Sequence, residues 1–316
     1  MEQRLGYIYG IAAYLCWGAF PLYFALLADI DPYEAVPWRV LTALVFCVLA
    51  VTVMRAWSPV FEILRSARMF GWFILASLLL YANWQIFVVG VVTERILETA
   101  LGYFINPLVT ILIGVIVRKE RLTRLQWIAV GIAGIGVIIS AIAYGQFPLI
   151  ALSLAFTFGF YGAVRKQTSQ HVDALTGLTV ETMIASAIAI PQLIVILLLA
   201  GRLGAFEHGP AITTLLLLSG VVTAIPLLLF AAGNRRLPLS HMGFIQFTTP
   251  ILAFLTGYFI FHEEMPLARW IGFAAVWVAL IVLLVDMVLS IRRVRRTPAG
   301  AEPPLTTGEI ATHPVL

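Results

Sequence analysis

The chain has 316 residues, of which 61% are hydrophobic and only 11% are charged, and its formal net charge is +4. Soluble domains carry roughly 45–50% apolar and 25% charged residues, so this composition excludes an ordinary soluble protein and indicates an integral membrane protein. The positive balance then reports contact with anionic lipid headgroups, and no nucleic-acid partner is expected.

Apolar runs of about 20 residues match the thickness of a bilayer core at a rise of about 1.5 Å per residue. The chain predicts an all-α integral membrane protein, and the first run is expected to stay as a helix because no cleavage signal follows it. The tail 291–316 is predicted to be a disordered cytoplasmic end. The expected transmembrane helices are 6–27, 35–54, 70–93, 98–117, 125–143, 148–164, 176–199, 212–233, 240–261 and 268–289.

Positive charge predicts the orientation of these spans. Sixteen of the 20 Lys and Arg residues fall on the side of the N-terminus, whereas only Arg95, Arg202 and Arg269 fall in loops on the other side. Under the positive-inside rule, this bias places both termini in the cytoplasm. We therefore expect a multi-pass protein of a bacterial cytoplasmic (inner) membrane.

Two parts of the chain repeat the same marks. Five spans per repeat is an odd number, so the second repeat, 144–290, must be inserted upside down relative to the first, 1–143. Inverted repeats of this kind are typical of alternating-access transporters. The matched pairs, all 143 residues apart, are Pro107 and Pro250, Gly114 and Gly257, Trp127 and Trp270, and Ile128 and Ile271.

Polar and aromatic side chains within the spans predict where a solute binds, because burial of polar groups in lipid is costly unless they have partners. Aromatic faces suit the apolar body of a small solute, and amides suit its polar groups. The alternative is that the amides join neighbouring helices by hydrogen bonds, and for any single residue the two interpretations are equally open. The predicted substrate-binding residues are Tyr14, Trp17, Asn83, Trp84, Tyr103, Asn106 and Gln246.

Five further residues are candidates for gating or coupling. Arg39 and Glu181 lie inside spans at opposite depths, so each needs its own partner or a water-filled cavity, unless it reaches the interface. Glu98 begins a span, where a carboxylate also favours the helix dipole. Pro107 and Pro250 each remove a backbone donor and weaken a span one turn earlier, either as a hinge or as a static kink.

No motif points to a metal, a cofactor or an enzyme. Cys16 and Cys47 both lie within spans, and HExxH, Walker A, GxSxG and CxxC patterns do not occur in the sequence. The small residues of GIAGIG at 131–136, together with Gly6 and Gly10, permit close helix packing and allow a homodimer.

Several blocks of sequence resemble one known family. They are AAYLCWGAFPLYF at 12–24, LGYFINPLV at 101–109, LAFTFGFYGAVRK at 154–166, VETM at 180–183 and IPLLLFAAGNRRLPLSHMGF at 225–244. These blocks are similar to those of RarD-type permeases, EamA-domain members of the drug/metabolite transporter superfamily. The resemblance implies a ten-helix inner-membrane transporter built from two inverted EamA repeats. The chain departs from the family pattern at Ala25, where a lysine is usual, and at Thr99 and Ala100.

These observations together predict a secondary transporter, or permease, that moves a small organic metabolite or drug through a lipid bilayer by alternating access. One alternative is a passive channel or facilitator, which would show flux without saturation or counterflow. Another is a membrane-embedded lipid enzyme, which would need a nucleophile or a metal site at one membrane face.

Overall fold

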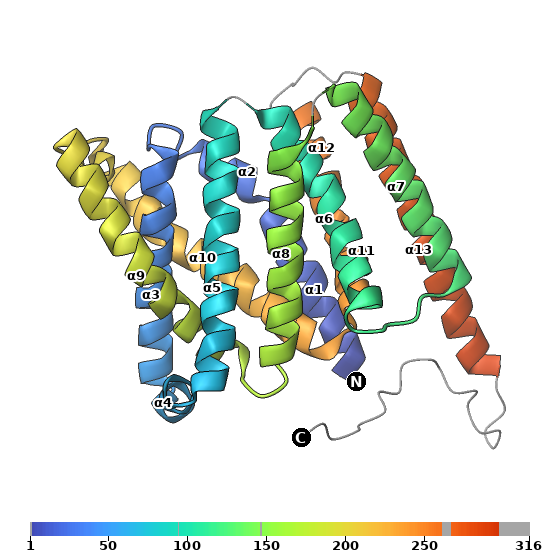
Figure 1. The fold of residues 1–316 in the computed structure, drawn as a ribbon, viewed down its shortest axis with the longest axis horizontal. Coiled ribbons are helices and arrows are strands. Elements are labelled where there is room, and N and C mark those ends of the chain that lie inside the picture. The colour runs from blue at the N-terminus through green and yellow to red at the C-terminus, as the bar shows by residue number, and fades with distance from the viewer. Residues whose placement is uncertain (1, 94, 146, 261–266, 297–316) are drawn as a thin grey trace.

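The computed structural model describes residues 2–93, 95–145, 147–260 and 267–296. Within these residues all regular secondary structure is helical, and the helices lie side by side as one bundle (Figure 1). The helices are α1 (Glu2–Gly18), α2 (Phe20–Ala25), α3 (Pro32–Val53), α4 (Trp57–Arg65), α5 (Ala67–Val92), α6 (Ile96–Ile116), α7 (Arg124–Tyr144), α8 (Leu149–Thr168), α9 (Ala174–Ala200), η1 (Gly204–Phe206), α10 (Gly209–Arg236), α11 (Leu239–Gln246), α12 (Thr248–Phe259) and α13 (Leu267–Arg296).

Seven segments are long and apolar enough to cross a membrane, judged by length and composition. They are Glu2–Ala25, Pro32–Val53, Ala67–Gly90, Arg124–Ile142, Leu149–Thr168, Ala174–Ala200 and Gly209–Arg236. The other three expected spans coincide with α6, whose strongly apolar part is the shorter Leu101–Ile116, with the interrupted pair α11 and α12, and with α13. The expected tail starts too early, because α13 continues to Arg296, and residues 297–316 lie outside the described part.

One helix in the loop regions was not expected. The amphipathic α4 buries Val60 and Ile63 in a cluster with Phe73 of α5 and Val180 of α9. Its opposite face exposes Phe61. The hydropathy of the sequence predicts no span here, because the apolar face of this segment is too short to cross a bilayer.

Two charged side chains stabilise the turn between α10 and α11 by hydrogen-bonding the free backbone groups at the helix ends. Lys166 Nζ donates to the carbonyl oxygens of Asn234, Arg235 and Leu237. The two carboxylate oxygens of Glu120 accept from the backbone N–H groups of Leu239 and Ser240, at 2.7 and 2.8 Å. Free carbonyls at a C-terminus and free N–H groups at an N-terminus are thereby satisfied with charge of the favourable sign.

Helix pairs that are in contact correspond between the two repeats: when each helix is replaced by its equivalent in the other repeat, the new pair is also in contact. The pair α1 and α10 has its equivalent in α8 and α5, and the pair α6 and α8 has its equivalent in α11 and α12 with α1. The pairs α3 with α9, α6 with α11, and α7 with α13 are their own equivalents and join the two halves. Equivalent helices run in opposite directions, since α1 begins at the edge of the bundle where α8 ends (Figure 1).

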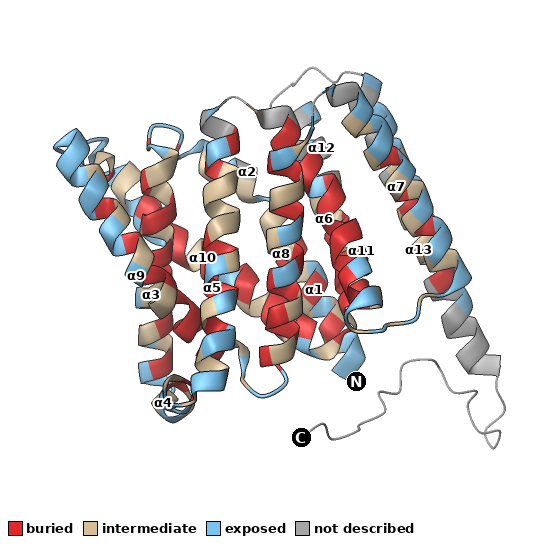
Figure 2. Ribbon diagram, in the orientation of Figure 1, coloured by how far each residue is buried: buried red, intermediate tan, exposed pale blue. Residues whose placement is uncertain are grey.

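Most of the basic residues gather at that same edge. It holds the start of α1, the helix α4, the end of α8 and the end of α13 (Figure 1). Arg165 and Lys166, which follow the expected span 148–164, belong to the last turn of α8 and are buried. Figure 2 shows that buried positions concentrate on the central helices, while much of α7 faces outward. There Gly131 and Gly134 have open space where a side chain would be, so they make no close contact within the chain.

The closest approach of α3 and α10 generates a prediction about stability. A methyl group on Gly220 would overlap the backbone of Thr42 and Ala43. Gly220→Ala should therefore separate the helices and lower the free energy of unfolding by about 1–3 kcal/mol, despite the better helix propensity of alanine. The matched control is Gly131→Ala, which meets no atom within 4 Å. Thermal unfolding in detergent measures both, and equal melting temperatures would contradict the tight packing.

Candidate functional site

The side chain of Arg39 lies in a ring of aromatic residues between helices. Its guanidinium carbon is 4.6 Å from the ring centre of Phe24, 5.0 Å from that of Trp84 and 5.9 Å from that of Phe20. Its Nε donates to Thr223 Oγ1 at 3.1 Å. We call these four neighbours of Arg39 the cation cage; they come from α2, α5 and α10, so the cage includes both repeats.

The cage holds the charge of Arg39 without neutralising it. Ion pairs in the described part of the chain join Arg95 to Glu98, Arg165 to Glu181, Arg202 to Glu207 and Arg236 to Glu2, and none of them includes Arg39. A cation over an aromatic face gains about 0.5–2 kcal/mol, depending on its desolvation. Tyr103 lies near the guanidinium yet is 40% exposed, so its ring borders a space between helices.

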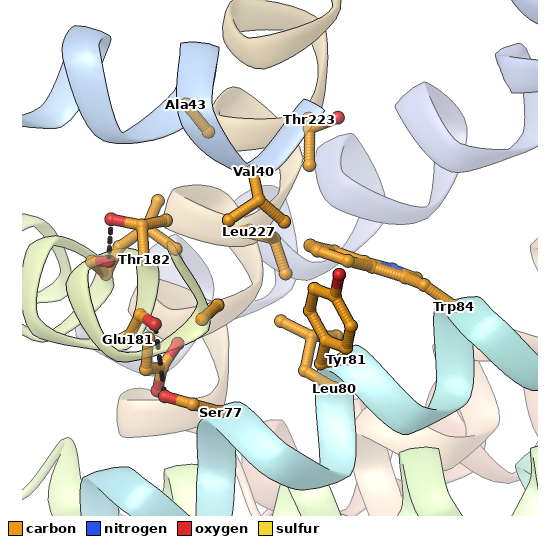
Figure 3. Close-up of a pocket in the computed structure, with 12 residues that line it drawn as sticks. Val40, Ala43, Ser77, Leu80, Tyr81, Trp84, Glu181, Thr182, Thr223 and Leu227 are labelled. Carbon is orange, nitrogen blue, oxygen red and sulfur yellow. Dashed lines mark hydrogen bonds between the residues drawn. The ribbon is translucent and has the colours of Figure 1, made fainter. Parts of the chain in front are cut away.

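A small cavity lies beside the cage. It has a volume of about 10 Å³, and both Thr223 and Trp84 line it. Figure 3 shows Trp84 and Tyr81 of α5 facing Val40 of α3 and Leu227 of α10 across this space. Such a volume is about the minimum for one water molecule. At this cavity the helices therefore leave no room for a solute, which would require them to separate.

Glu181, at the far side of this cavity, has its own buried partner. Its Oε1 lies 3.2 Å from Arg165 Nη1, and the two side chains are 2% and 1% exposed. Tyr161 Oη donates to Glu181 Oε2 at 3.3 Å, and Ser77 donates to the Glu181 carbonyl oxygen. Removing one member of such a buried pair generally costs about 3–5 kcal/mol, so this pair contributes to the fold whatever else it does.

The first of the two repeated prolines, Pro107, lies where α6 meets α11. Gly243 of α11 sits against α6 so closely that a methyl group there would lie 3.0 Å from the Pro107 carbonyl oxygen. One residue before each proline stands a polar side chain, Asn106 or Thr249. Asn106 Oδ1 and Thr249 Oγ1 are both buried and have no hydrogen-bond partner among the described residues. A buried unpaired polar atom costs about 1–3 kcal/mol, so these two repeat-related atoms are candidates for contact with a solute or water.

The two proline segments differ in backbone shape. α6 runs without interruption through Pro107, whereas α11 ends at Gln246 and α12 begins at Thr248. Between them, the Phe247 N–H bonds to the Phe244 carbonyl at 3.3 Å, a tighter turn than that of an α-helix. The predicted weakening one turn before the proline therefore takes the form of an interruption in one repeat only.

Comparison with known proteins decides the family. The profile of the EamA-like transporter family matches residues 4–142 and again residues 147–285. The chain belongs to the EamA-like transporter family. It therefore carries two tandem EamA repeats and is a multi-pass membrane protein of a transporter family rather than an enzyme family. The expected boundaries at 143 and 290 stay predictions.

Bacterial relatives match this EamA chain over nearly its whole length. Protein RarD of Streptomyces exfoliatus is 40% identical, covering 96% of this chain and 95% of its own. An uncharacterized transporter of Bacillus subtilis, YojE, is 39% identical over 91% and 96%. Protein RarD of Escherichia coli is 36% identical over 92% and 98%. A crystal structure 15% identical in sequence shares the fold, with a TM-score of 0.68 over 89% of this chain and 98% of the other.

Six of the seven predicted substrate-binding residues of this EamA member form three pairs in the structure. Trp84 and Tyr103 lie at or near Arg39, and Asn106 and Gln246 lie at the proline crossing, where Thr110 Oγ1 donates to Gln246 Oε1 at 3.2 Å. Tyr14 and Trp17 pack together with Phe158 and Phe230, in the same hydrophobic cluster against which Trp84 packs.

Asn83 and Glu98 make contacts between helices. Asn83 Nδ2 donates to the Leu154 carbonyl and to Thr157 Oγ1 of α8, both at 2.9 Å. Glu98 Oε1 accepts from the Ile150 N–H at 2.6 Å, at the start of α8, and its other oxygen pairs with Arg95. Glu98 thus caps a neighbouring helix in addition to lying in the first turn of its own.

The sequence predicted Trp84 but not the other three residues that hold Arg39: Phe20, Phe24 and Thr223. Phe20 and Phe24 are four residues apart in α2, a spacing that places two rings on one helix face. That spacing was a usable signal. Thr223 had none, because a threonine in an apolar helix looks the same whether it bonds its own backbone or a distant side chain.

Paired substitutions of Asn106 and Asn83 separate a binding role from a packing role. Asn106→Leu removes an unpaired buried oxygen, so we expect stability to be unchanged or raised by up to about 1 kcal/mol while transport falls. Asn83→Leu breaks two hydrogen bonds to α8 and should lower stability by about 1–2 kcal/mol. Thermal unfolding and solute uptake are measured for both variants. Normal uptake by Asn106→Leu would assign that residue to packing.

Proposed function

We propose that this EamA-family member is a secondary transporter that moves a small organic metabolite or drug across the bacterial cytoplasmic membrane by alternating access. It would do so with ten transmembrane helices arranged as two inverted five-helix repeats. The observation that carries the proposal is the unequal shape of the two proline segments. Pro107 lies in an uninterrupted helix, whereas Pro250 follows a one-residue interruption at Phe247, whose backbone stays right-handed with φ −59° and ψ −15°.

The inequality matters because inverted repeats face opposite sides of a membrane. If the interruption in one repeat and the continuous helix in the other exchanged places, the side of the membrane that can open would change as well. The interruption at Ala19, between α1 and α2, is not evidence for two conformations of equivalent sequences. Pro21 explains it by lacking a donor for the Trp17 carbonyl, and the equivalent position in α8 is Val164, which keeps its donor.

Both termini face the cytoplasm in this proposal, because the basic edge of the bundle holds the start of α1 and the end of α13. The sequence has no nucleotide-binding motif, so uphill transport draws on an ion or solute gradient. The unpaired oxygens of Asn106 and Thr249 are available to solute or water once the closed helices separate.

Counterflow in proteoliposomes tests the function. A screen for compounds that raise the melting temperature of the purified protein supplies the solute. Vesicles preloaded with unlabelled solute should then take up labelled solute transiently above its equilibrium level, and uptake should saturate. Linear uptake without an overshoot would instead identify a passive channel or facilitator. Empty vesicles and a heat-inactivated sample serve as controls.

Probe cysteines at Ile105 and its repeat equivalent Thr248 test the role of the prolines. Pro107→Ala and Pro250→Ala each restore a backbone donor in one repeat, so the two variants should favour states that open to opposite sides. Labelling of the probes by an impermeant maleimide, added to intact cells or to inverted vesicles, measures which side is open. Identical patterns in the two variants would reduce the prolines to static kinks.

Two reference positions fix the sides of the membrane in that experiment. Exposed Arg121 and exposed Asp31, each changed to Cys in a protein lacking Cys16 and Cys47, should react only from the cytoplasm and only from outside, respectively. The opposite result would reverse the proposed orientation.

A further inference from the structure

We infer that the cation cage around Arg39 binds the anionic group of the solute, so that the solute is a small organic acid with an apolar, flat body. This inference rests on the proposed transport function and adds the charge of what is carried. It starts from the position of Arg39 within the apolar bundle, where an unneutralised charge is costly and needs a specific reason.

The acids buried in the described part of the chain are all engaged elsewhere. Glu34 accepts from the N–H groups of Gly204 and Ala205, at 2.8 and 2.9 Å, and from Trp38. Glu98 binds the start of α8, and Glu181 pairs with Arg165. Asp286 accepts from Thr123 and Gln126 at the start of α7. These four carboxylates have structural tasks, and none of them neutralises Arg39.

The guanidinium group also keeps two donor nitrogens for an incoming anion. Thr223 occupies only Nε, and the aromatic rings of the cage offer no hydrogen-bond acceptor to the terminal nitrogens. The described residues provide no partner for those two nitrogens. Their fixed fork matches the two oxygens of a carboxylate, which gives a short charge-assisted pair.

The surroundings of the fork select the rest of the solute. Phe24 and Trp84 present aromatic faces within 5.0 Å of the guanidinium carbon, and exposed Tyr103 borders the same region. Flat apolar groups pack well against such rings. Trp84 and Thr223 also face the cavity shown in Figure 3, so a solute held by Arg39 would enter the space between α3, α5 and α10 as it opens.

The cage further links solute charge to the state of the helices. In the closed structure the negative faces of three rings take the place of an anion around Arg39. Separation of α2 and α5 from α3 removes those faces and leaves the cation unshielded. A carboxylate that enters at that moment compensates the charge, so an anionic solute favours the open state more than a neutral one.

The test uses matched pairs of acids and their neutral amides as probes. They are indole-3-acetate with indole-3-acetamide, benzoate with benzamide, and hexanoate with hexanamide. Each is added to the purified full-length protein in detergent at constant ionic strength, and the melting temperature is followed over a concentration series. We expect at least one acid to bind at least about tenfold more tightly than its amide, the effect of one charge-assisted hydrogen bond.

Variants of Arg39 assign that preference to the cage. Arg39→Gln should abolish the difference between acid and amide, and Arg39→Lys should keep part of it, because lysine retains the charge but loses the fork. If Arg39→Gln does not fold, Arg39→Lys and the wild-type pairs still decide. The control is Arg202→Gln, which removes a cation in an exposed loop pair and should leave the preference intact. Equal binding of acids and amides by the wild-type protein, or an unchanged preference in Arg39→Gln, overturns the inference.

The outcome is separable from the test of transport. Saturable counterflow of a neutral or cationic solute, with no preference for acids, would leave the transporter proposal standing and reject the organic acid. Binding of acids that depends on Arg39, without counterflow of any bound acid, would keep the anion site and reject transport.

Discussion

The cost of holding charge within an apolar bundle is the constraint on which the rest of the structure depends. A charge or an unpaired backbone group at membrane depth must find a protein partner, because no water is available there. The buried charges of this protein follow that rule by securing helix ends. Lys166 serves the end of α10, and Asp286 serves the start of α7. Arg39 stands apart, because its neighbours shield the charge without opposing it.

Close helix packing complements this electrostatic requirement. Gly220 allows α10 to approach the backbone of α3, and this approach brings Thr223 within reach of Arg39. Gly243 does the same for α11 and α6, where the two proline segments meet. Both glycines therefore position candidate functional groups, and their effect on function acts through the distance between helices rather than through contact with a solute.

Much of this architecture follows from the sequence, because the bilayer imposes a length and the repeat imposes a period. The apolar runs coincide with helices, and the family profile matches twice. What the sequence could not supply was the identity of each polar partner. Asn83 and Asn106 look alike in the sequence, yet one bonds α8 and the other has an unpaired oxygen. The difference depends on which helix lies opposite, and hydropathy carries no information about that.

The burial of Arg165 could not be predicted for the same reason. Arg165 directly follows an apolar run, as a loop residue would. Glu181 lies opposite it, however, and the ion pair compensates the cost of burying the charge. The interruption at Phe247 was likewise only half predictable. Proline identifies where a helix can weaken, while the neighbouring helices determine whether it does.

The two repeats keep a common geometry but not a common chemistry. Glu98 and Ile150 tie α6 to α8 at one end of the bundle, and their equivalents 143 residues away, His241 and Tyr7, tie α11 to α1 at the basic end. The first contact is a charge-assisted bond of 2.6 Å from a fully buried carboxylate, whereas the second joins an imidazole and a phenol at 2.7 Å. Bonds to charged groups are worth about 1.5–3 kcal/mol and neutral ones about 0.5–1.5 kcal/mol. Equivalent helix pairs are thus held with unequal strength at the two ends, so the energetic symmetry of the repeats is broken even where their contacts correspond.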